Sequence, residues 1–247
     1  MQRLAIAAIV AIFVGLLPMA ALAGETVIWG GYGGLSAGAM WLDVGELNDY
    51  LDPLRVSDFS STVPMIGLDA YALLGGRVVV GLEGYGFNQT KSGALADASL
   101  RGGYGVLYCG YNVVHTDNFR LRPEIGLGGM GANVAIHNVG WLLASHRLSN
   151  DYDEILLSQE GYIGTVAVAA EWTPSIMRRD NGRLDLVVSL KAGLRVPLWD
   201  EGWDAKAISD DDDDDDVDLD MDGPDLPMLA PYVALGIRFG GGITEID

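Results

Sequence analysis

The sequence predicts an all-β protein, an eight-stranded antiparallel up-and-down β-barrel that crosses a membrane. Two observations lead to this fold class. Apolar and polar residues alternate over eight segments, and the connections between these segments are alternately long and short. Alternation with a period of two is typical of a strand whose two faces meet different surroundings. The expected strands are 26–42, 62–74, 77–87, 96–113, 119–136, 162–173, 184–197 and 229–240.

The segment 184–197 shows the alternation most clearly. One face carries an apolar series, Leu184, Leu186, Val188, Leu190, Leu194 and Val196. The other face carries Asp185, Ser189, Lys191 and Arg195, with charges of both signs. A lipid-facing wall must be apolar, and a closed sheet leaves no backbone group unpaired. The charged face is therefore expected to line an enclosed lumen.

The connections fall into two classes. Gly75-Gly76 is a tight hairpin signal, and 114–118 and 175–182 are also compact. Four longer connections alternate with these three, and each of the first three long connections is longer than the short one that follows it. In outer-membrane barrels, short turns face the periplasm and long loops face outward. The expected outer loops are 44–61, 88–95, 137–161 and 198–228.

The first 23 residues have the features of a secretory signal peptide. Arg3 precedes an apolar run, and Ala-Leu-Ala stands before Gly24. We expect cleavage there; a membrane anchor is the alternative. The barrel domain is then 24–240, followed by a C-terminal tail, 241–247. Because Cys109 is the single cysteine, no internal disulfide framework is expected.

This organisation resembles the small eight-stranded outer-membrane barrels of OmpA and OmpX type. The resemblance is carried by the signal peptide, the alternating strands, the order of loop lengths and the closing segment PYVALGIRFG, and it covers the mature chain. Such barrels usually end on an aromatic residue; Phe239 fills that position, but GGGITEID follows it. The resemblance implies the bacterial outer membrane as location, and outer-membrane lipid, lipopolysaccharide and the barrel-assembly machinery as partners.

Strand parity predicts a lumen charge network of eleven residues. Its six cations and five anions are Arg101, Arg120, Arg122, Lys191, Arg195, Arg238, Asp69, Glu83, Glu124, Glu171 and Asp185. Charges in a narrow lumen are costly unless they are paired, and eight strands leave room for side chains but little else. The near balance of charge therefore predicts a filled interior without a wide pore.

Nine aromatic residues near the expected strand ends fit the interfacial girdles of such barrels. They are Trp29, Trp41, Tyr85, Phe87, Tyr104, Phe119, Trp172, Tyr232 and Phe239.

The net charge of −19 argues against nucleic acid as a partner, and the four outer loops carry −18 of it. Seven consecutive aspartates, 210–216, repel one another, so 204–225 is expected to be disordered. Asp218, Asp220 and Asp222 precede Gly223 and open a calcium-loop motif, but its twelfth position is Leu229. Weakly bound Ca²⁺ is the one cofactor candidate, with divalent cations as partners; a merely solvated acidic loop is the alternative.

No catalytic motif is found. His115, His137 and His146 are the available bases, and Ser145 and Ser149 lie near the last two, but their spacing matches no catalytic arrangement. The chain is therefore predicted to be a non-enzymatic protein of structural or surface-interaction type. The alternatives are a narrow channel for small solutes and an exported soluble β-barrel or sandwich that binds a ligand.

Overall fold

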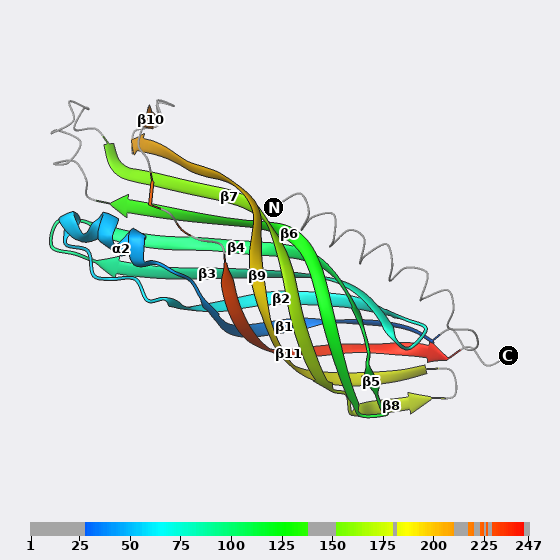
Figure 1. The fold of residues 1–247 in the computed structure, drawn as a ribbon. Coiled ribbons are helices and arrows are strands. Elements are labelled where there is room, and N and C mark those ends of the chain that lie inside the picture. The colour runs from blue at the N-terminus through cyan, green and yellow to red at the C-terminus, as the bar shows by residue number, and fades with distance from the viewer. Residues whose placement is uncertain are drawn as a thin grey trace.

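The computed structural model describes residues 28–137, 152–179, 182–209, 217–219, 223–224, 226 and 229–244. Within these ranges, eight long antiparallel strands close into a barrel (Figure 1). They are β1 (Ile28–Trp41), β2 (Thr62–Leu74), β3 (Val78–Ser92), β4 (Asp97–Tyr111), β6 (Phe119–His137), β7 (Tyr152–Trp172), β9 (Gly182–Ser209) and β11 (Ala230–Thr244). Each pairs with the next, and β11 pairs with β1, so the predicted fold class is confirmed.

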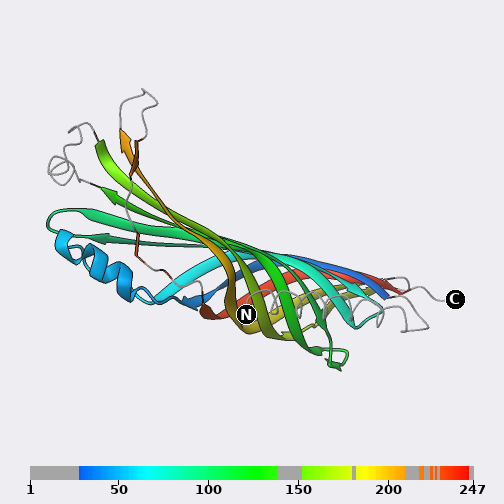
Figure 2. The ribbon, with the colours of Figure 1, turned by 45° about the horizontal axis from the view of Figure 1, so that its top comes forward.

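Short elements extend the two ends of the barrel. The helix α2 (Gly45–Leu51) and the 3-10 helix η1 (Asp52–Leu54) follow β1. At the same end as α2, β10 (Val217–Leu219) pairs with the last part of β9. At the opposite end, β5 (Val114–His115) lies beside β6, and β8 (Ser175–Arg179) lies beside β9. Figure 2 shows α2 and β10 at the end away from the described C-terminus. None of the helices in the described ranges is long and apolar enough to cross a membrane.

The short connections and the first and last described residues lie together at one end of the barrel. Gly75 and Gly76 join β2 to β3 with φ values of 56° and 71°, a left-handed conformation that glycine adopts without strain. At the same end Ile28 of β1 pairs with Thr244 of β11. We call this the short-turn end, and the opposite end, with α2 and β10, the long-loop end.

The barrel wall is strongly apolar on the outside. Ile66 is 72% exposed and Leu68 is 63% exposed. Further exposed apolar residues surround the wall: Leu35, Leu82, Leu107, Val166, Val168, Leu184, Leu190, Leu194, Leu235 and Ile237. Soluble monomers rarely expose so extended an apolar surface, whereas the lipid-facing band of a membrane barrel must do so. The wall is therefore built to contact lipid.

Most strands are longer than the sequence pattern predicts. The boundaries of β2 agree, but β3 continues to Ser92, β7 begins at Tyr152, and β9 continues to Ser209. The expected loops 88–95, 137–161 and 198–228 are correspondingly too long, and 204–209, expected to be disordered, is strand. Strand β11 also includes part of the expected tail, through Thr244. The signal peptide, 1–23, and the aspartates 210–216 lie outside the described residues.

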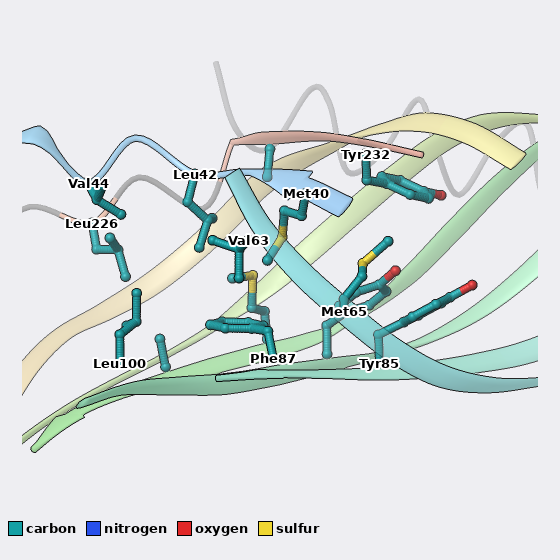
Figure 3. Close-up of a cluster of buried hydrophobic side chains, with 14 of the residues drawn as sticks. Met40, Leu42, Val44, Val63, Met65, Tyr85, Phe87, Leu100, Leu226 and Tyr232 are labelled. Atoms are coloured by element: carbon teal, nitrogen blue, oxygen red, sulfur yellow. The ribbon is translucent and has the colours of Figure 1, made fainter. Parts of the chain in front are cut away.

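The expected outer loop 44–61 is partly helical. Leu47 and Leu51 of α2 are buried and join an apolar core that fills the long-loop half of the interior. In Figure 3, Leu226 lies among Leu42, Val44 and Leu100 of this core. The sequence analysis predicts a polar lumen and no such apolar part. The long-loop half of the interior is thus mainly apolar, whereas the short-turn half holds the charged side chains together with buried Leu73, Val79 and Val187.

Candidate functional site

Ten of the eleven residues predicted for the lumen charge network lie buried inside the barrel. Arg101 does not: it is exposed, and the prediction for it is wrong. The inward residues of β4 are the even-numbered ones, among them Leu100, Tyr104 and Tyr108. Both faces of β4 contain apolar residues and glycines, so its alternation is ambiguous in the sequence. Arg101 therefore lies on the outer wall.

Two arginines and two carboxylates form the centre of the network. Arg122 Nη2 lies 2.9 Å from Glu171 Oε1, and Arg238 Nη1 lies 3.2 Å from the same oxygen. Arg238 also donates from Nε and Nη2 to the two carboxylate oxygens of Asp69. Tyr71 donates its hydroxyl proton to Glu171 Oε2 at 3.0 Å. Because these groups come from β2, β6, β7 and β11, they link the wall across the lumen.

Lys191 binds two carboxylates at once. Its Nζ is 2.7 Å from Glu83 Oε2 and 2.6 Å from Glu124 Oε2. Glu124 also accepts a hydrogen bond from Arg122 Nε at 2.6 Å, which joins Lys191 to the central cluster. The Nζ lies 4.4 Å from the centre of the Tyr108 ring, within the range of a cation–π contact. All these side chains are almost completely buried, so water does little to screen the charges.

Asp185 closes the network toward the short-turn end. It accepts hydrogen bonds from Tyr32 OH at 3.0 Å and Ser175 Oγ at 2.9 Å. Arg183 Nε lies 2.8 Å from Asp185 Oδ2. Arg120 donates to the Tyr32 hydroxyl at 3.3 Å, so it is held through the tyrosine.

Arg195 lies where the charged half meets the apolar half. Its guanidinium carbon is 3.5 Å from the centre of the Tyr104 ring and 4.9 Å from that of Tyr232. It also contacts the sulfur atoms of Met40 and Met65. No carboxylate in the described part of the chain forms an ion pair with it. Aromatic faces and sulfur therefore hold this fully buried cation.

Tyrosines complete the lumen, and most of their roles are not among those predicted from the sequence. Tyr32, Tyr71 and Tyr108 contact the charged side chains. Of the three, Tyr71 shares its strand parity with a predicted network residue, Asp69 of β2, and that signal could have identified it. Four aromatics predicted for the girdles are instead buried inside: Tyr85, Phe87, Tyr104 and Tyr232. Four others are exposed on the wall: Trp41, Phe119, Trp172 and Phe239. The side chain of Trp29 lies outside the described set.

The predicted calcium motif falls mostly on residues outside the described ranges. Asp218 belongs to β10, whereas Asp220 and Asp222 are not described. Across the described segments, no group of three or more His, Cys, Asp or Glu side chains is arranged to hold a metal ion. A calcium site therefore stays a prediction.

The histidines are dispersed. His115 pairs with Arg120 at the short-turn end, whereas His137 lies at the long-loop end with its Nδ1 3.3 Å from Glu154 Oε2. His146 is outside the described residues. Partial burial, and then the cations Arg120, Arg183 and Arg77, lower the pKa of His115 from its ordinary value of 6.5, against the opposing effect of Asp117.

The lowered pKa of His115 predicts that the stability of the folded barrel depends on pH. Because the unfolded chain takes up the proton of His115 at higher pH than the folded barrel, stability is lost as pH falls from 6.5 to the lower folded pKa. We expect the urea midpoint of unfolding to fall further in the parent protein than in His115→Gln between about pH 7.5 and pH 5. Equal falls in the two proteins would contradict the assignment.

No protein-family model and no curated protein matches the sequence. Solved structures with a similar arrangement include the attachment invasion locus protein Ail of Yersinia pestis, with a TM-score of 0.42, 8% identity, and 90% of this chain and 100% of Ail covered. The outer membrane protein OprG of Pseudomonas aeruginosa has a TM-score of 0.35 and 11% identity, with 91% and 99% covered. The outer membrane protease OmpT of Escherichia coli has a TM-score of 0.31 and 8% identity, with 90% and 97% covered. The pairing of the chain's own strands shows a closed antiparallel barrel of eight long strands.

Proposed function

We propose that this chain is a bacterial outer-membrane protein whose barrel is closed to solutes and whose role is structural or surface interaction. The observation that carries the proposal is the ion-pair network that crosses the lumen. Arg122, Arg238 and Lys191 each bind a carboxylate from a different strand. A solute would have to break several buried pairs, and each separation leaves uncompensated charge in a poorly solvated interior.

The apolar half of the interior supports the same proposal. Met40, Val63 and Leu100 in that half are almost completely buried, and Gln159 is a buried polar side chain there, so the described residues offer a passing ion few polar partners. The exposed apolar wall argues against the soluble ligand-binding alternative, because such a surface would aggregate in water. With the lumen filled, the surfaces that remain for interaction are the wall and the outer loops. The segments expected from sequence to be outer loops, parts of which extend the strands, carry −18 of the net charge of −19, which suits hydration and contact with divalent cations at a lipopolysaccharide surface.

Planar-bilayer recording of the purified barrel tests the closed lumen. We expect no stable conductance steps under conditions in which an open porin, inserted as a control, conducts. Reproducible steps of uniform size from the parent barrel would overturn the proposal in favour of a narrow small-solute channel.

A further inference from the structure

Two guanidinium groups share one carboxylate at the short-turn end of the lumen. Arg183 Nε lies 2.8 Å from Asp185 Oδ2, and the Tyr32 hydroxyl donates to the same oxygen at 3.0 Å. Arg120 reaches this carboxylate through the tyrosine, because its Nη2 donates to the Tyr32 hydroxyl at 3.3 Å. The group formed by Arg120, Asp185 and Arg183 therefore carries two positive charges and one negative charge. We call it the Arg120 cluster.

The guanidinium of Arg120 has hydrogen-bond donors that the described residues do not use. Arg120 is completely buried, and its Nε and Nη1 atoms have no hydrogen-bond partner in the described part of the chain. A guanidinium stays protonated in proteins, so this cation cannot be neutralised by losing a proton. Unpaired buried donors are costly, and more so on a charged group. An acceptor with a negative charge would therefore be stabilised beside Arg120.

The nearby carboxylates of the lumen are engaged by other cations. Glu171 pairs with Arg120 in the β6–β7 ladder, but its Oε1 binds Arg122 and Arg238. Within the described lumen and its short-turn end, six cations face five carboxylates: Arg120, Arg122, Arg183, Lys191, Arg195 and Arg238 against Asp69, Glu83, Glu124, Glu171 and Asp185. One positive charge is left over, and one monovalent anion would balance it.

The Arg120 cluster lies close to water. The side chain of Arg183 is 24% exposed, and Ser175, whose hydroxyl donates to Asp185, is exposed. Figure 1 shows β8, which carries Ser175, at this end of the barrel together with β5. A small ion can thus reach Arg120 when the Arg183 side chain moves aside. Arg195 also lacks a carboxylate, but it lies deeper, against the apolar half of the interior.

The electrostatic potential at this end is positive. Besides partial burial, the cations Arg120, Arg183 and Arg77 lower the pKa of His115, against the opposing effect of Asp117. The three arginines come from β6, from β9 and from the turn between β2 and β3. Their fields therefore overlap around the Arg120 cluster, and a concave site of one sign attracts a counter-ion.

We propose that the short-turn end of the lumen binds one small monovalent anion, a halide such as chloride, between Arg120 and Arg183. The unused N–H groups of Arg120 donate to the anion, and Arg183 supplies the second positive charge. A halide is smaller than phosphate or sulfate, which suits an interior that side chains fill. The bound anion compensates the buried charge of Arg120 and so stabilises the folded barrel by mass action.

The dependence of stability on chloride tests this site. The barrel is unfolded by urea in detergent micelles while sodium gluconate is replaced stepwise by sodium chloride at constant ionic strength. We expect the urea midpoint of the parent to rise by about 0.5 M when chloride reaches about ten times its dissociation constant. Arg120→Gln removes the buried cation, so its midpoint should not depend on chloride. Arg183→Gln should reduce the rise by about half.

Arg77→Gln is the matched control. Arg77 lies at the same end, but its Nη1 donates to the Tyr111 hydroxyl at 3.2 Å, so this donor already has an acceptor. The variant should keep the chloride dependence of the parent. A parent midpoint that is independent of chloride would overturn the proposal. An equal loss of dependence in Arg77→Gln and Arg183→Gln would also overturn it, because attraction would then be diffuse. If Arg120→Gln does not fold, this comparison decides.

Bromide in place of chloride locates the ion in crystals of the parent protein. We expect an anomalous-diffraction peak within hydrogen-bond distance of an Arg120 nitrogen, and a weaker peak in Arg183→Gln. A stronger peak beside Arg195, or peaks on the outer surface alone, would contradict the assignment. A peak at Arg120 with no effect of chloride on the urea midpoint would mean an adventitious ion only, which would also refute the site.

Discussion

Replacing Lys191 by Met is expected to destabilise the barrel by about 3–5 kcal/mol. Lys191 is the cation that lies against Glu83, and it also binds Glu124. Its removal leaves the Glu83 carboxylate buried without an ion-pair partner, whereas Glu124 keeps Arg122. Urea unfolding in detergent micelles or vesicles, followed by tryptophan fluorescence and gel mobility, measures the loss.

Two further variants separate the ion pair from the loss of a long side chain. Adding Glu83→Gln to Lys191→Met removes the uncompensated charge and should recover about 0.5–3 kcal/mol. Arg195→Met also removes a buried cation but breaks no carboxylate pair, so its loss should stay below about 2 kcal/mol, the size of a desolvated cation–π contact. Equal losses for Lys191→Met and Arg195→Met would mean that side-chain volume and not pairing stabilises the lumen.

Replacing Leu107 by Arg is expected to destabilise the folded barrel in lipid vesicles by about 2–4 kcal/mol, the cost of a cation near the bilayer midplane on a barrel wall. Leu107 is 57% exposed and lies between Arg101 and the short-turn end of β4 at Tyr111. Leu95→Arg makes the same change on a residue that is 41% exposed in the β3–β4 turn, beyond the apolar wall of the barrel. The Leu95→Arg variant should lower the free energy of unfolding only slightly.

The difference between these two variants measures the environment of the wall. On a soluble protein, both positions would be open to water, and an arginine at either would change stability by less than about 0.5 kcal/mol. Similar small effects at Leu107 and Leu95 would therefore contradict a lipid-facing wall.

The parts of the fold that lie within the bilayer could be predicted from sequence because lipid and lumen impose opposite polarity on alternate residues. Strand β2 agrees with its predicted bounds, and the parity of Lys191 and Arg195 places both inside. The rule fails for Arg101 because glycines leave β4 without a clear apolar face. Beyond the bilayer both faces of a strand meet water or packed side chains, so the alternation ends while the hydrogen-bonded ladder continues to Ser209 of β9.

The partners within the lumen could not be predicted, because they depend on contacts between distant strands. Glu83 and Lys191 are far apart in sequence and meet only when β3 and β9 face each other across the closed barrel. The apolar half was missed for a related reason. Leu47 and Leu51 lie in a short acidic segment expected to be a loop, and their burial follows from the packing of α2 against the extended strands.

The central claim is that this chain folds as a closed barrel in an outer membrane. The most direct test is gel mobility of the isolated outer-membrane fraction in detergent, with one sample boiled and one unboiled. We expect the protein to require detergent for extraction and its mobility to change on boiling, as the hydrogen-bonded barrel opens. Release by salt alone, with identical mobility before and after boiling, would contradict it.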